Sequence, residues 1–180
     1  MSRNIFFLLG ILLCAASAAR AADGFVGHYG YLVTIPEGYS TSASFKEEAE
    51  VVLFFPSSCE RSSFSECAKV GLLELTVLPK RWVKKDGISS FKQYIDAVVQ
   101  GLLRMKAAPG VTRSKINGRP SAKIYMRGIP ENLNAMLLLE GSKVYYRVKF
   151  RESVSEKTAA GLLSSLSEVQ PGDTPPPQKR

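Results

Sequence analysis

The sequence is poor in the residue types on which most catalytic and metal sites depend. Its 180 residues include one histidine, three cysteines and one tryptophan. His28 is therefore the single imidazole available as a base for a Ser-His-Asp or Cys-His hydrolase, and no G-x-S-x-G elbow accompanies it. Three closely spaced glycines, Gly24, Gly27 and Gly30, are not followed by a helical pattern that would make a phosphate-binding loop. We expect no enzyme and no cofactor.

Acidic and metal-ligating clusters are equally scarce. Glu47, Glu48 and Glu50 precede an apolar segment, and such a cluster is more typical of a solvated strand edge than of a general acid and base. A metal site would need more ligands than His28 and two thiols supply. The composition thus gives no basis for a metal site.

Long hydrophobic runs are also missing, apart from a short one at the start. Ile5 to Leu13 is too short to span a bilayer, which takes about 20 apolar residues. Arg3 precedes it, and small residues ending in Ala19-Arg20-Ala21 follow it, which is the pattern of a signal peptide. We predict a leader over residues 1–21, cleavage near Ala21 and Ala22, and export to the periplasm or beyond the cell.

An alternative for the same segment is lipidation at Cys14. A lipidated cysteine follows a small residue, whereas Leu13 precedes Cys14. Cys14 is more simply explained as part of the apolar region that is removed with the leader.

The chain has an excess of positive charge. The formal net charge is +8, and loss of Arg3 and Arg20 with the leader lowers it to +6. For an exported protein, this surplus favours anionic lipid, wall polymer or an acidic partner over nucleic acid. It is also compatible with a domain whose basic character has no function.

Two cysteines, Cys59 and Cys67, remain after cleavage. An even number of thiols in an oxidising compartment predicts a disulfide, here closing a polar loop. The alternative is a redox-active pair, but such cysteines usually lie two residues apart at a helix start. We interpret the pair as a structural bridge.

Hydrophobic periodicity predicts an α+β domain at residues 22–169, followed by a disordered, proline-rich tail at 170–180. The longest helix begins after Ser90, where Ser90 and Gln93 form a capping box, and Pro109-Gly110 marks its end. Asn117-Gly118 predicts a hairpin. The expected strands are Phe25–Ile35, Ala49–Phe55, Val70–Leu78, Val111–Ile116, Ser121–Arg127, Asn134–Glu140 and Lys143–Phe150; the expected helices are Phe91 to about Lys106 and Ser155–Glu168.

The last predicted strand has two different faces. Its even positions are apolar, whereas Lys143, Tyr145, Arg147, Lys149 and Arg151 alternate with them. That second set predicts a solvent-exposed, positive face of the sheet.

Several of these features together resemble the PsbP-like group of α/β/α sandwiches. The features are an I-P-x-G-aromatic turn at Ile35–Tyr39, the hairpin at Asn117–Ala122 and the closing Y-x-V-x-F strand at Tyr146–Phe150. The group includes lumenal proteins of photosynthetic membranes, exported proteins similar to DcrB, and a transport factor that binds the Ran GTPase. The resemblance covers about Phe25 to Val169. It implies an antiparallel sheet of six to seven strands covered by two main helices, and a binding or assembly role without chemistry.

The best candidate for a binding surface is the basic segment between a strand and the main helix. We call its residues Lys80, Arg81, Trp82, Lys84 and Lys85 the basic segment. Cations around an aromatic residue are typical of a surface that meets lipid headgroups or an anionic partner. The alternative is that Trp82 packs on the sheet while the cations are merely solvated.

From the sequence we predict an exported, non-enzymatic binding or assembly accessory with a protein partner in the envelope. The alternative is direct binding of anionic lipid or wall polymer through the basic segment.

Overall fold

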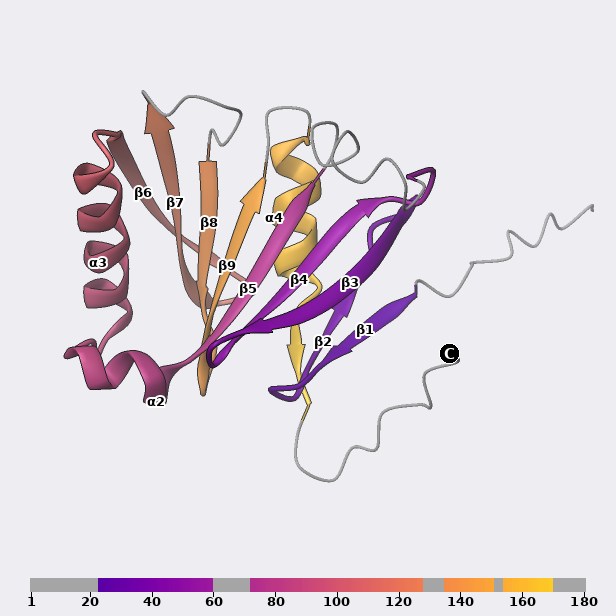
Figure 1. Ribbon diagram of the computed structural model, residues 1–180, viewed down its shortest axis with the longest axis horizontal. Helices are drawn as coiled ribbons and strands as arrows, with labels where there is room; N and C mark the ends of the chain where they lie inside the picture. The colour runs from indigo at the N-terminus through magenta and orange to yellow at the C-terminus, as the bar shows by residue number, and fades with distance from the viewer. Residues whose placement is uncertain (1–22, 60–71, 128–134, 151–153, 170–180) are drawn as a thin grey trace, which may run out of the picture.

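Two antiparallel β-sheets form the framework of the computed structural model, which describes residues 23–59, 72–127, 135–150 and 154–169 (Figure 1). The larger sheet has seven strands in the order β3-β4-β5-β9-β8-β7-β6, and the smaller has three in the order β1-β2-β10. The strands are β1 (Gly24–Gly27), β2 (Tyr31–Thr34), β3 (Tyr39–Lys46), β4 (Ala49–Pro56), β5 (Leu73–Pro79), β6 (Ala108–Ile116), β7 (Arg119–Arg127), β8 (Ala135–Glu140), β9 (Val144–Phe150) and β10 (Ser167–Glu168).

The helices lie on both faces of the larger sheet. The helical segments are α2 (Lys80–Val83), the 3₁₀ turn η2 (Lys84–Asp86), α3 (Phe91–Arg104) and α4 (Glu156–Ser164). One apolar cluster joins α4 and the small sheet to Val52, Leu75 and Tyr146 of the large sheet. A second cluster joins α2 and α3 to the opposite face. The α+β class, with its helices covering one antiparallel sheet, is therefore confirmed.

Strand β9 shows how alternation positions the two clusters. Val144, Tyr146 and Val148 belong to the cluster under α4, whereas Tyr145 belongs to the cluster under α3. The prediction that the face of β9 containing Tyr145 is exposed to solvent is wrong. Tyr145 is 2% exposed and stacks on Tyr94 of α3, with ring centroids 4.4 Å apart. A polar pattern on a strand does not reveal that a helix covers it.

The main helix and the Asn-Gly hairpin match the sequence prediction. The Ser90 side chain accepts a hydrogen bond from the backbone N–H of Gln93, and the Gln93 side chain accepts one from the Ser90 N–H, which makes the capping box. Asn117 and Gly118, with φ of 50° and 75°, form the two-residue turn between β6 and β7. Positive φ at both positions is what a type I′ hairpin turn requires.

Four elements differ from the prediction. The expected helix Ser155–Glu168 ends at Ser164, and Ser167–Glu168 instead pairs with β2 as strand β10. The expected strand Phe25–Ile35 is a hairpin of β1 and β2, because the chain turns at Gly30, whose φ is 71°. Strand β3 was not predicted, since its serine-rich sequence lies at the sheet edge and is mostly exposed. Pro109 and Gly110 do not end α3; they lie in β6, after a left-handed residue at Lys106.

Some predictions fall outside the described residues. These are the leader at 1–21, Cys67 and the tail at 170–180. The Cys59–Cys67 bridge, the domain limits and export therefore stay predictions.

Candidate functional site

The basic segment begins where β5 ends. Pro79 is the last residue of β5, and the chain then makes the short helix α2 and the turn η2, which is capped by Gly87 with a φ of 79°. Successive residues of a helix point in different directions, so this contiguous run of sequence divides between two sides of the molecule.

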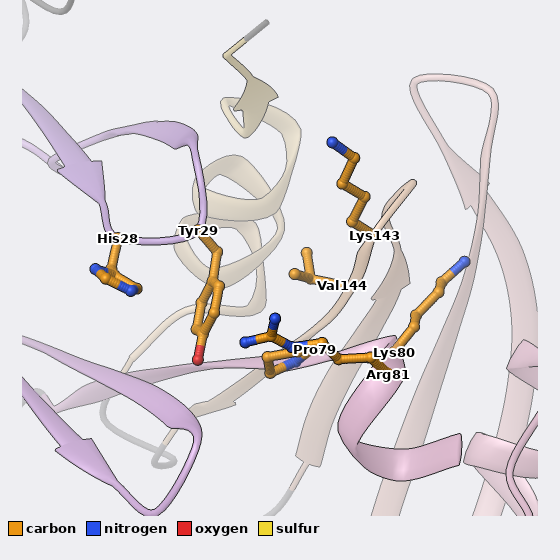
Figure 2. Close-up of a pocket in the computed structure, with 7 residues that line it drawn as sticks. All are labelled: His28, Tyr29, Pro79, Lys80, Arg81, Lys143 and Val144. Carbon is orange, nitrogen blue, oxygen red and sulfur yellow. The ribbon is translucent and has the colours of Figure 1, made fainter. Parts of the chain in front are cut away.

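Lys80 and Arg81 line a concave site of about 480 Å³, which we call the basic pocket (Figure 2). Three separate parts of the chain meet there: the turn between β1 and β2, the junction of β5 and α2, and the start of β9. The lining residues are His28, Tyr29, Pro79, Lys80, Arg81, Lys143 and Val144. In Figure 2 the Tyr29 ring and the Arg81 guanidinium approach each other across the pocket.

The β1–β2 turn is held in place by the strand opposite. The backbone N–H of His28 donates to the carboxylate of Glu50, at 3.1 and 3.0 Å from its two oxygens, and Glu50 is 3% exposed. The Tyr29 hydroxyl donates to the backbone carbonyl of Glu48. These bonds fix the side of the pocket that the turn contributes.

Carboxylates neutralise part of the positive charge. The Lys80 ammonium lies 2.8 Å from Glu140 and 5.0 Å from the centre of the Tyr145 ring. Glu48 lies 3.9 Å from Arg81 and 3.6 Å from Lys85, so one carboxylate serves two cations. Burial, followed by the charge of Glu48, raises the pKa of Tyr29.

One cation of the pocket lining, Lys143 just before β9, is exposed and has no carboxylate partner among the described residues. The same holds for Lys84 on η2, outside the lining. The pocket region therefore keeps a positive excess that is accessible to solvent, and its chemistry suits an anionic group.

Trp82 lies on the other side of α2. It packs against the apolar cluster under α3, together with Ile88 and Val98, and lines a second groove there. The structure thus brings Lys80 and Arg81 together and separates them from Trp82, while Lys84 and Lys85 are exposed on η2. This matches the alternative in which Trp82 packs on the sheet.

The sequence did not connect His28, Tyr29 or Lys143 with the basic segment. It predicts His28 and Tyr29 within one continuous strand and Lys143 on a strand face, whereas their meeting depends on how β1–β2 folds onto the large sheet. The signal for the turn was Gly30, which the alternating pattern on either side concealed.

The imidazole at the basic pocket, that of His28, lies against aromatic rings. His28 is exposed, and its ring lies edge-on to Tyr29 and Phe45, each with centroids 5.2 Å away. Over the described ranges no three His, Cys, Asp or Glu side chains gather as metal ligands would. Within the same ranges no helix is both long and apolar enough to cross a membrane.

These features define a class of protein: an α+β sandwich with a basic pocket at one end of its central sheet. No protein-family model matches the sequence, and no curated protein matches it either. Among solved structures, the chain is similar to the PsbP protein of the cyanobacterium Synechocystis, with 10% sequence identity and a TM-score of 0.53, over 87% of this chain and 98% of that one. The chain therefore has a PsbP-like fold, as the sequence resemblance implied.

A second solved structure, from Bacteroides thetaiotaomicron, has 13% identity and a TM-score of 0.44. It matches 86% of this chain, which spans about half (51%) of that protein.

Proposed function

We propose that this protein is an exported, non-enzymatic accessory protein that binds an acidic protein partner in the cell envelope through the basic pocket. The observation that carries the proposal is the gathering of Lys80, Arg81 and Lys143 from distant parts of the chain around one cavity. The PsbP-like fold supports a binding or assembly role, since the group it resembles works in this way.

Anionic lipid or wall polymer is the second candidate ligand. The exposed Lys84 and Lys85 on η2, which follows α2 directly, favour it. The packing of Trp82 against the sheet counts against an anchor that inserts into a membrane, because the indole is already used in the apolar cluster.

The test is affinity capture from envelope extract at low and at high salt, with three forms of the protein. The first is the wild type, and the second replaces by Gln the lining residues Lys80, Arg81 and Lys143, together with Lys85, which shares Glu48 with Arg81. The third is a matched control with the same loss of charge at exposed sites outside the pocket lining, Lys92, Arg104, Arg113 and Lys115.

We expect the wild type and the control to retain one protein near stoichiometry, and the pocket variant to lose it. Higher salt should weaken retention, since exposed charges are screened over about 10 Å at 0.1 M salt. Equal capture by the pocket variant and the control rules out the basic pocket as the binding site. Retention of lipid or polymer at low salt alone establishes the second candidate instead.

Export has its own test. We expect the protein made from the full-length sequence to reach the periplasm or medium with an N-terminus near Ala22, measured by N-terminal sequencing. A cytoplasmic protein that still begins at Met1 contradicts export, and this result does not affect the proposal for the basic pocket.

A further inference from the structure

A second concave site lies on the α3 face of the sheet, apart from the basic pocket. It is a groove of about 440 Å³ between α3, α2 and the strands beneath them, within the size range of about 300–1,000 Å³ typical of small-molecule sites. Apolar side chains form most of it, including Trp82, Ile88, Val98, Leu102 and Met105. Met105 is 66% exposed, so the groove has an apolar rim that is open to solvent.

Two polar groups in this groove lack hydrogen-bond partners. Tyr94 is 4% exposed, and its hydroxyl is buried with no partner among the described residues. The Nε of Arg147 is also buried with no partner among the described residues. Both residues line the groove. Unsatisfied buried donors are unusual in folded proteins and require an explanation.

The charges around these donors leave a positive excess. A terminal nitrogen of Arg147 donates to Thr76 Oγ1 at 3.3 Å, which uses part of the guanidinium. The neighbouring Lys149 lies 3.2 Å from Glu74, so this part of the face has two cations and one carboxylate among the described residues. Arg147 is also close enough to Tyr94 to oppose the effect of burial on the pKa of that phenol. An anion that reaches these two buried atoms would find an unpaired guanidinium N–H and an unpaired phenol O–H.

We propose that the groove binds a free medium-chain carboxylate. Its carboxylate accepts hydrogen bonds from Tyr94 and Arg147, and its apolar chain lies along Trp82 and α3. Burial of the ligand's apolar chain supplies affinity, and the two donors orient its carboxylate. Apolar and polar groups commonly have these separate roles in small-molecule sites. This inference stands independently of the partner proposed for the basic pocket.

The test uses decanoate and decanol at concentrations where both are monomeric, with the protein made from its full sequence. The two probes share the apolar chain and differ in charge. Isothermal titration calorimetry or the fluorescence of Trp82 measures binding. We expect decanoate to bind at least about tenfold more tightly, because charge-assisted hydrogen bonds are stronger than neutral ones.

Two variants test the donors, each with a matched control. Tyr94→Phe should weaken decanoate binding about fivefold to tenfold while leaving the free protein at least as stable, because it removes a hydroxyl that has no partner in the ligand-free fold. Tyr125→Phe, at an exposed tyrosine on β7, should change neither. Arg147→Gln should abolish the preference for decanoate over decanol, and Arg113→Gln should preserve it.

Several results overturn the proposal. Equal affinity for decanoate and decanol shows that nothing recognises the head group. No binding of either probe shows that the groove is filled or too shallow. If Arg147→Gln does not fold, the wild type's relative affinity for decanoate and decanol and the Tyr94→Phe variant still test the proposal. A Tyr94→Phe protein that binds decanoate as well as the wild type refutes the assigned role of the donors.

Discussion

Replacement of Gly27 by Ala should destabilise the protein strongly, because the Tyr31 ring occupies the space of the missing side chain. A Cβ built on Gly27 would lie 2.0 Å from two carbons of that ring and 2.5 Å from its oxygen. Tyr31 is 0% exposed and packs edge-on against Tyr146, with ring centroids 5.7 Å apart, so the ring has no free space to enter. The backbone of Gly27 is not left-handed, and the expected effect is therefore steric alone.

Overpacking a filled core usually costs about 1–3 kcal/mol, and the depth of this clash places Gly27→Ala at about 2–3 kcal/mol. Urea denaturation followed by Trp82 fluorescence measures the free energy of unfolding. Gly110→Ala is the matched control, since nothing lies within 4 Å of a Cβ there, and it should change stability by less than about 0.5 kcal/mol.

A double-mutant cycle isolates the contact. Tyr31→Leu removes the ring atoms that the new methyl group meets. The loss of unfolding free energy in the double variant should therefore be smaller than the sum of the two single losses, by about 1 kcal/mol or more. The reasoning fails if Gly27→Ala and Gly110→Ala have the same free energy of unfolding. It also fails if the losses of stability from Gly27→Ala and Tyr31→Leu add in the double variant.

Further predictions concern the helices and the tyrosines. Ser90→Ala should cost about 1 kcal/mol in urea denaturation because it removes the capping box of α3. Gly161→Ala should stabilise the protein by about 0.5–1 kcal/mol, since Gly161 lies in α4 with nothing within 4 Å of a new Cβ; a loss of stability there contradicts the described packing. Burial raises the pKa of Tyr94 to about 12, so the folded state retains a proton that the unfolded state loses above pH 10. Stability should therefore fall as the pH rises from about 10 to 12, and Tyr94→Phe should show a smaller fall over that range; equal slopes in the two proteins contradict the burial of this phenol.

The sequence predicted the elements whose residues carry local signals. The capping box at Ser90 and the Asn117-Gly118 turn have their own backbone chemistry, and both are present in the fold. Strand β3 has no such signal, since pairing with β4 rather than burial makes it a strand.

The candidate site was predictable only in part, because contiguity in sequence is not proximity in space. The basic segment is one run of residues, but α2 directs Lys80 and Arg81 toward His28 and Tyr29, and directs Trp82 toward α3. The groove depends on Arg147, whose place on an apparently exposed strand face gave no indication that α3 would cover it.

The pairing of β10 with β2 has a consequence for how the chain must fold. Ser167 and Glu168 complete the sheet begun by Tyr31 and Leu32, and α4 covers that N-terminal hairpin. Contacts between such distant segments close slowly, since a long loop must be ordered before they form. A chain that emerges N-terminus first therefore cannot complete the burial of Tyr31 until α4 and β10 have emerged. Premature termination before Val154 would remove α4 and β10 and leave the apolar residues that they cover exposed, which favours aggregation.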